Sequence, residues 1–204
     1  TDTFRVIRFS ETSSEFAAAP VIATPENIQN GLAYVESLGG GGGTYMTAGI
    51  NRALDEPGDE NTLRLVTFLT DGYIGNDFEV LKLVDEKIGN SRLFAVGVGS
   101  GVNTYLLDEI GSRGRGFTRY IDPNSEDLVA AAKELAERLH SPVLTDIEVN
   151  FGGRVSSVYP SQIPDLFTGQ SIRLVGTYSQ AGPMEGTISG TANGKRVTIP
   201  IQAE

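Results

Sequence analysis

The chain has 204 residues, 39% hydrophobic and 21% charged, which is enough to bury a sizeable core in one large domain or in one and a half ordinary ones. Its 26 acidic residues outnumber its 16 Lys and Arg residues, and the net charge of −10 argues against nucleic-acid binding, which needs a basic face. Cysteine is absent, which excludes disulfides, thiolate zinc sites and a cysteine nucleophile, and no apolar run approaches the roughly 18 residues of a membrane span.

The first fifty-five residues predict a strand followed by two helices. The stretch 4–10 is typical of a strand, and Thr24-Pro25 predicts a helix start with Thr24 as the N-cap. Five glycines at 39–43 end this helix, and a second short helix is expected from Tyr45 to about Asp55. Apolar residues at helical spacing predict an inward-facing stripe on the first helix, formed by Ile28, Leu32, Val35 and Leu38.

The stretch Leu65–Gly72, with the sequence LVTFLTDG, is the central feature of the chain. A short apolar run that ends in a turn signal favours a strand buried on both faces of a parallel sheet. Asp71 stands at the carboxyl end of this strand, and Gly72 allows the backbone to turn there. Since open α/β sheets bind their ligands at the carboxyl ends of the strands, Asp71 is a candidate binding residue.

Helices and strands alternate after Asp71. The predicted elements are a helix at 77–88, a strand at 93–98, a helix capped by Asn103, a strand at 116–121 and a helix opened by residues 125–127. This order predicts an α/β fold with a doubly wound, mainly parallel sheet that helices cover on both faces.

The hydrophobic period changes from 3.6 to 2 beyond Pro142, which predicts antiparallel β structure. Charge changes at the same place: residues 1–142 hold 12 basic and 21 acidic residues, and residues 143–204 hold 4 and 5. Asn193-Gly194 predicts a hairpin, and Pro200 predicts an edge strand. We therefore expect two domains, 1–141 and 142–204, the second being an incomplete sandwich-like region.

Several stretches together resemble a known family. They are DTFRVIRFS (2–10), GGGGTYMTAGINRAL (40–54), LRLVTFLTDG (63–72), LFAVGVG (93–99) and YPSQIPDLFTGQSIRLVGTY (159–178). The first four resemble a Rossmann-like von Willebrand factor A domain. The last is similar to the β region of inter-alpha-trypsin inhibitor heavy-chain-like proteins, including bacterial members.

This resemblance implies a metal-ion-dependent adhesion site built by three loops. Thr44 matches the threonine of the second loop and Asp71 matches the aspartate of the third. The implied ion is Mg²⁺, or Mn²⁺ or Ca²⁺, which prefer such hard oxygen ligands and can take a last ligand from a partner.

The Asp-x-Ser-x-Ser motif of the first loop appears nowhere in the 204 residues. In the family it ends a first strand, which a helix follows, and we expect both to lie upstream of Thr1. Two expectations follow. Metal affinity of this chain should be weak or absent. The missing central strand should also leave unpaired strand edges that must close, receive another segment or promote self-association.

Each candidate residue also has a plain structural interpretation. Asp71 is equally typical of a turn or a helix N-cap, and Thr44 of a helix N-cap, a role compatible with metal binding. The glycines at 39–43 follow a helix and precede no lysine, unlike a phosphate-binding loop. His140 suits a helix C-terminus, and Tyr73 either contacts a partner or packs.

The expected function is a non-enzymatic adhesion or protein-binding module that captures a carboxylate of a protein or matrix ligand. One alternative is a metal-independent scaffold or interaction domain of a larger exported protein. Another is a nucleotide-dependent α/β hydrolase or transferase. The resemblance implies an extracellular, cell-surface or periplasmic location.

Overall fold

The computed structural model describes residues 2–10, 13–40, 43, 45–55, 62–140 and 142–203. The described helices are α1 (Pro25–Ser37), α2 (Met46–Leu54), α3 (Asp77–Lys87), α4 (Thr104–Arg113) and α5 (Leu128–His140). The described strands are β1 (Thr3–Phe4), β2 (Ile7–Phe9), β3 (Ser13–Glu15), β4 (Val21–Ile22), β5 (Leu65–Thr70), β6 (Arg92–Val98), β7 (Thr118–Ile121), β8 (Pro142–Asn150), β9 (Val155–Tyr159), β10 (Leu166–Phe167), β11 (Val175–Tyr178), β12 (Met184–Ala192) and β13 (Lys195–Ala203).

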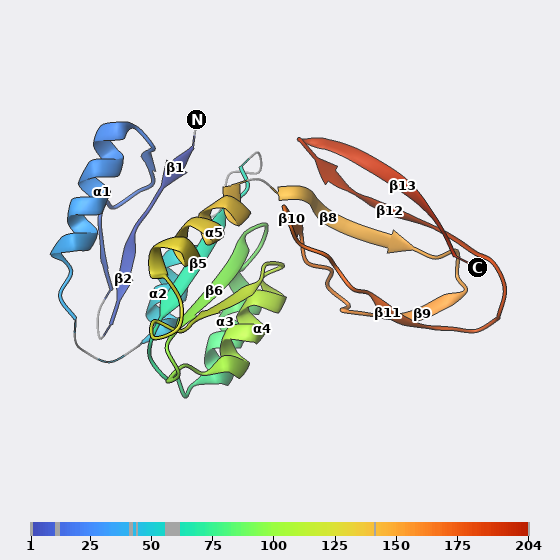
Figure 1. The fold of residues 1–204 in the computed structure, drawn as a ribbon, viewed down its shortest axis with the longest axis horizontal. Coiled ribbons are helices and arrows are strands. Elements are labelled where there is room, and N and C mark those ends of the chain that lie inside the picture. Colours follow the sequence, from blue (N-terminus) through green and yellow to red (C-terminus); the bar gives the residue numbers. More distant parts are fainter. Residues whose placement is uncertain are drawn as a thin grey trace.

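A parallel three-stranded sheet of order β5-β6-β7 forms the centre of the α/β part. Figure 1 shows α1, β1 and β2 on one flank of this sheet and the antiparallel part on the other. Helices α2, α3 and α4 cover one face, and α5 packs on the other through Ala131 and Leu135 against Val96 and Ile121. The larger core cluster includes Met46, Ile50, Phe68, Val80, Leu93, Ala95, Leu106 and Ile110. The predicted α/β class, with helices on both faces of a parallel sheet, is confirmed.

Strand β5 is buried on one face only, so the prediction of burial on both faces is wrong. Phe68 and Thr70 are buried, whereas Leu65 and Leu69 on the other face are exposed, Leu69 by 61%. The reason is the position of the strand. Among the described strands β5 pairs only with β6, and α5 packs over β6 and β7 instead.

The predicted stripe on α1 is also wrong. Ile28, Leu32 and Val35 are 45–57% exposed, and the buried residue of this helix is Gly31. A Cβ at Gly31 would lie 2.9 Å from Phe4 Cε2, so glycine allows the Phe4 ring to approach the helix backbone. The side of α1 that faces the protein is thus the one where Gly31 meets the Phe4 ring and Tyr34 meets the Phe16 ring.

The stretch 4–10 forms two short strands and not one. Strand β1 pairs with β4, and β2 pairs with β3, both antiparallel. Strands β2 and β5 belong to different sheets and do not pair with each other in the described structure. Phe9 of β2 and Phe68 of β5 nevertheless meet edge to face, with ring centroids 6.2 Å apart. The two strands thus share a core on the α2 side without sharing backbone hydrogen bonds.

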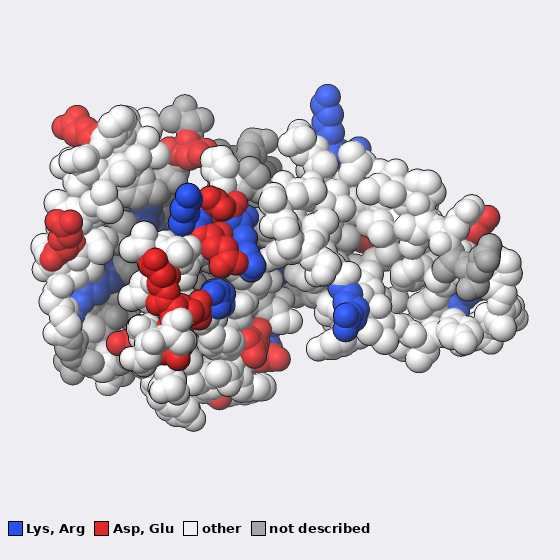
Figure 2. All heavy atoms as spheres, in the orientation of Figure 1, with Lys and Arg blue, Asp and Glu red and all other residues white. Residues whose placement is uncertain are grey.

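The antiparallel part contains a sheet of order β10-β8-β12-β13 and a separate β9–β11 pair. Asn193 and Gly194 have φ of 50° and 71° between β12 and β13, which confirms the predicted hairpin. Pro200 lies in the edge strand β13, as predicted. On the face drawn in Figure 2, charged side chains gather on the α/β part and leave most of the antiparallel part uncharged. The division into domains 1–141 and 142–204 stays a prediction.

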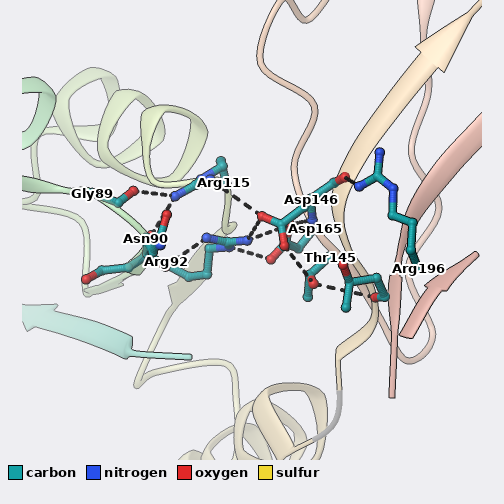
Figure 3. A network of polar contacts seen from close by, with 10 residues as sticks. Gly89, Asn90, Arg92, Arg115, Thr145, Asp146, Asp165 and Arg196 are labelled. Carbon is teal, nitrogen blue, oxygen red and sulfur yellow. Dashed lines mark hydrogen bonds and ion pairs between the residues drawn. The ribbon is translucent and has the colours of Figure 1, made fainter. Parts of the chain in front are cut away.

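A buried ion-pair network joins the two parts (Figure 3). Arg92, at the start of β6, is 1% exposed and forms ion pairs with Asp165, which is 2% exposed, and with Asp146 of β8. The Asp165 carboxylate also accepts a hydrogen bond of 3.0 Å from the Asp146 backbone N–H. Burial and the charge of Arg92 lower the pKa of the neighbouring Arg115. The charge of Arg92 in the α/β part is therefore balanced by two carboxylates of the antiparallel part.

Three aromatic rings fill the same junction. Phe94 of β6, Phe117 and Phe167 of β10 meet with ring centroids 4.9–6.2 Å apart, and Arg138 of α5 lies over the Phe117 ring. Phe94 and Phe167 are fully buried. The antiparallel part is thus docked on the α/β part by both apolar and charged contacts.

Candidate functional site

Asp71 follows β5 at the carboxyl end of the parallel sheet, as predicted. Its side chain is exposed, while the preceding Thr70 is buried and accepts a hydrogen bond of 3.2 Å from the Gly72 N–H through Oγ1. A Cβ at Gly101 would lie 3.7 Å from the Asp71 carbonyl oxygen, so the loop after β6 borders the loop after β5. We call these two loops, residues 71–76 and 99–103, the carboxyl rim.

Thr44 lies outside the described residues, so its predicted approach to Asp71 stays a prediction. The next residue, Tyr45, occupies the N-cap position of α2 and is 57% exposed, and Met46 is fully buried. The Tyr45 N–H donates to the carbonyl oxygen of Ser10 over 3.2 Å, which connects the start of α2 to the end of β2.

The described residues match a divalent-ion site only in part. They contain no group of three or more His, Asp or Glu side chains that could hold a metal ion. Asp71 offers one hard carboxylate at the rim, and no ion pair engages it among the described residues. This carboxylate could supply one ligand of a metal site, but the other ligands that a complete site needs are not found among the described residues.

Asn103 organises the carboxyl rim in a way that the sequence did not reveal. Its Oδ1 caps α4 by accepting from the Leu106 N–H over 3.1 Å, as the sequence predicted. Its Nδ2 donates to the Ile74 carbonyl oxygen over 2.8 Å and to Asp77 Oδ1 over 2.9 Å. One buried side chain therefore fixes both loops of the rim and the start of α3. Only the N-cap role has a local sequence signal, because the other partners lie 26–29 residues away.

Large aromatic side chains project from the same end of the sheet. Tyr73 in the rim is 72% exposed, Phe78 in the first turn of α3 is 80% exposed, and Tyr105 in the first turn of α4 is 60% exposed. Of these three residues, only Tyr73 was a candidate from the sequence. Phe78 and Tyr105 each stand beside the apolar stripe of an amphipathic helix, so sequence alone does not distinguish them from core residues.

A groove of about 390 Å³ lies between α3 and α4, with Phe78, Leu81 and Tyr105 among its lining residues. Its other lining residues are Asp77, Lys82, Asp85 and Arg113. Burial opposes protonation of Arg113, but hydrogen bonds and charges from Glu109 and Asp85 outweigh it and raise the pKa of Arg113. Arg113 is thus paired with two carboxylates of its own chain.

None of the described helices has the length and apolar character that crossing a membrane requires. His140 is the last residue of α5, the position that its helix C-terminal interpretation predicted.

Comparisons with known proteins give consistent relatives. No family model matches the chain. It is 26% identical over 97% of its length to a von Willebrand factor A domain-containing protein of Dictyostelium discoideum, covering 10% of that protein. It is 24% identical over its full length to inter-alpha-trypsin inhibitor heavy chain H2 of Sus scrofa, covering 23%, and 27% identical over 96% to heavy chain H6 of Homo sapiens, covering 16%. The chain therefore spans only about a tenth to a quarter of these relatives.

Solved structures share the fold. A von Willebrand factor type A structure from Catenulispora acidiphila matches 98% of the chain with a TM-score of 0.68 and 16% identity, and the match covers 57% of that structure. Proximal thread matrix protein 1 from the mussel byssus, in a structure with a zinc-occupied MIDAS motif, matches 73% of the chain with a TM-score of 0.52, covering 37% of that chain. The relatives of this chain are von Willebrand factor A domain proteins and inter-alpha-trypsin inhibitor heavy chains, as its motifs predicted, and its fold is that of a von Willebrand factor A domain.

Proposed function

We propose that the chain is a non-enzymatic protein-binding module that uses the carboxyl rim around Asp71 as its binding surface. The observation that carries this proposal is the placement of Asp71. It is an exposed carboxylate at the end of β5, bordered by a second loop, with no cation of the described residues paired to it. Two comparisons support the assignment: the chain is related in sequence to von Willebrand factor A domain proteins and inter-alpha-trypsin inhibitor heavy chains, and one structural neighbour has a metal-ion-dependent adhesion site that holds zinc.

In a longer protein, Thr44 and Asp71 would hold a divalent ion, Mg²⁺ or alternatively Mn²⁺ or Ca²⁺. Further oxygen ligands would have to come from a loop outside these 204 residues. The ion, when bound, supplies a coordination position for a carboxylate of a protein or matrix ligand. The hydrogen bond from the Gly72 N–H to Thr70 fixes the turn that carries Asp71, so the Asp71 carboxylate would be held rigidly as one of these ligands.

The alternative is a metal-independent scaffold or interaction domain. It is favoured by the lack of a complete ligand group among the described residues. In either case we place the protein outside the cytoplasm, at the cell surface or in the periplasm, and expect the exposed edge of β5 to promote self-association of the isolated chain.

Calorimetric titration with Mg²⁺ and Mn²⁺ tests the metal assignment. We expect the 204-residue chain to bind neither ion with micromolar affinity, and a longer protein with an intact Asp-x-Ser-x-Ser loop to bind one of them. Asp71→Asn should abolish that binding, whereas Glu137→Gln, at an equally acidic but remote position on α5, should not. Micromolar binding by the 204-residue chain, or by the longer Asp71→Asn variant, would contradict the assignment.

A further inference from the structure

The groove between α3 and α4 combines exposed aromatic rings with two carboxylates, Asp77 and Asp85, and with two cations, Lys82 and Arg113, that lie next to carboxylates of the same two helices. We propose that it binds a lysine or arginine side chain of a partner polypeptide. This inference goes beyond the proposed function and requires no metal ion at Asp71. It rests on the residues that line the groove and on their ion-pair partners.

Aromatic rings form the exposed walls of the groove. Phe78 and Tyr105 are 80% and 60% exposed, and leaving apolar ring surface in water costs free energy. Leu81, which also lines the groove, is only 6% exposed. Aromatic faces attract cations, and an apolar floor accepts the alkyl stem of a long basic side chain. The volume of about 390 Å³ is sufficient for such a side chain.

The four charged residues that line the groove balance one another, and the neighbouring Glu86 and Glu109 make its surroundings negative. Arg113 is paired with both Asp85 and Glu109, and Lys82 lies 3.8 Å from Glu86, so these pairs leave one carboxylate in excess. Asp77 adds a second carboxylate that no cation balances, because the hydrogen bond that it accepts comes from the neutral side-chain amide of Asn103.

Two further features bear on this charge. The N-terminal ends of α3 and α4 contribute about half a positive charge each, which offsets only part of the excess. Neither 70–81 nor 97–107, the segments that form this end of the sheet, contains a Lys or Arg residue. The local field therefore favours a cation over an anion.

The position of the groove is fixed before any partner binds. Asn103 holds Asp77 and the Ile74 carbonyl at once, so the first turns of α3 and α4 keep their spacing. One oxygen of Asp77 accepts that bond, and the other is left to accept from an ammonium or guanidinium group. Because Asn103 also fixes the loop that begins at Asp71, a partner bound in the groove would lie beside the carboxyl rim.

Peptide binding tests the proposal with N-acetyl tetra-arginine amide as the cationic probe and N-acetyl tetra-citrulline amide as the uncharged control of similar shape. We expect the arginine peptide to bind more tightly, with an affinity that falls as NaCl rises and does not change with EDTA. Phe78→Ala/Tyr105→Ala should weaken binding about fivefold or more. Tyr159→Ala/Tyr178→Ala, which removes two rings that are each 72% exposed on β9 and β11, should leave it unchanged.

The outcomes separate this proposal from the metal assignment. Asp71→Asn should leave binding of the arginine peptide within about twofold, since the groove acts without the ion. Equal affinity for the citrulline peptide, or equal losses in the two double variants, would overturn the proposal. Circular dichroism of each variant verifies that the fold is retained, and all four substituted rings are exposed, so folding should survive.

Discussion

Arg92 is the residue on which the junction between the two parts depends. Its side chain is 1% exposed, and its guanidinium group forms ion pairs with Asp165 and Asp146 in place of contacts with water. A buried charge whose partner is removed keeps its desolvation cost and loses its compensation. The geometry thus predicts that the charge on Asp165 matters more for stability than any surface carboxylate.

We predict that Asp165→Asn lowers the free energy of unfolding by about 3 kcal/mol, because it leaves Arg92 buried with only the half-exposed Asp146 as a counter-charge. Urea denaturation followed by far-ultraviolet circular dichroism measures the change. Glu137→Gln is the control: its partner Lys133 is 4.0 Å away and both side chains are more than two-thirds exposed, so the loss should stay below about 0.5 kcal/mol. Equal effects of the two substitutions would show that the Arg92 network contributes no more than a surface pair.

At the scale of single elements, α1 presents an apolar stripe to solvent. We predict that Leu32→Gln changes the free energy of unfolding by less than about 0.5 kcal/mol, because Leu32 is 57% exposed. Leu106→Ala in α4 should cost about 2–5 kcal/mol, since Leu106 is fully buried. The same urea experiment compares them, and a loss above about 2 kcal/mol for Leu32→Gln would mean that the stripe is covered in solution.

The helices show what local sequence determines and what it does not. The start of α1 was predictable because Thr24 caps it by a bond of 3.2 Å to the Asn27 N–H, a contact between neighbours in sequence. The buried side of α1 was not, because it depends on Phe4 meeting Gly31 from another element. Likewise the apolar run of β5 indicated a strand, but its burial depended on where α5 packs.

For the whole molecule, the sequence motifs predicted the α/β class, the antiparallel region and the position of Asp71. They could not predict the junction, since the bonds from Arg92 to Asp165 and Asp146 span 73 and 54 residues. For the same reason they missed the bridge that Asn103 makes across the carboxyl rim. The motifs located Asp71 after a strand end and Thr44 after a run of glycines, and the metal-binding role of both residues stays a prediction.

The edge of β5 that pairs with no described strand leads to the last prediction. The resemblance implies a strand between β2 and β5 in a longer protein. Apolar side chains are exposed on both elements that would border it: Leu65 and Leu69 on β5, and the stripe containing Leu32 on α1. Backbone groups of β5 that do not face β6 have no partner strand among the described residues. Such amides exchange with solvent through small local openings.

We therefore expect alternate amides of β5 to exchange rapidly in the 204-residue chain. Extension upstream by roughly forty residues, enough for one strand and one helix, should slow them by about a hundredfold or more. Hydrogen–deuterium exchange resolved by residue measures this, with the amides of β6 as an internal control, because β6 is already paired with β5 and β7 and should change little. If the β5 amides exchange equally fast in the extended protein, no upstream strand pairs with this edge of β5. If they are already protected in the 204-residue chain at high dilution, the edge is closed in the monomer, and the strand predicted for this position is not needed to complete the sheet.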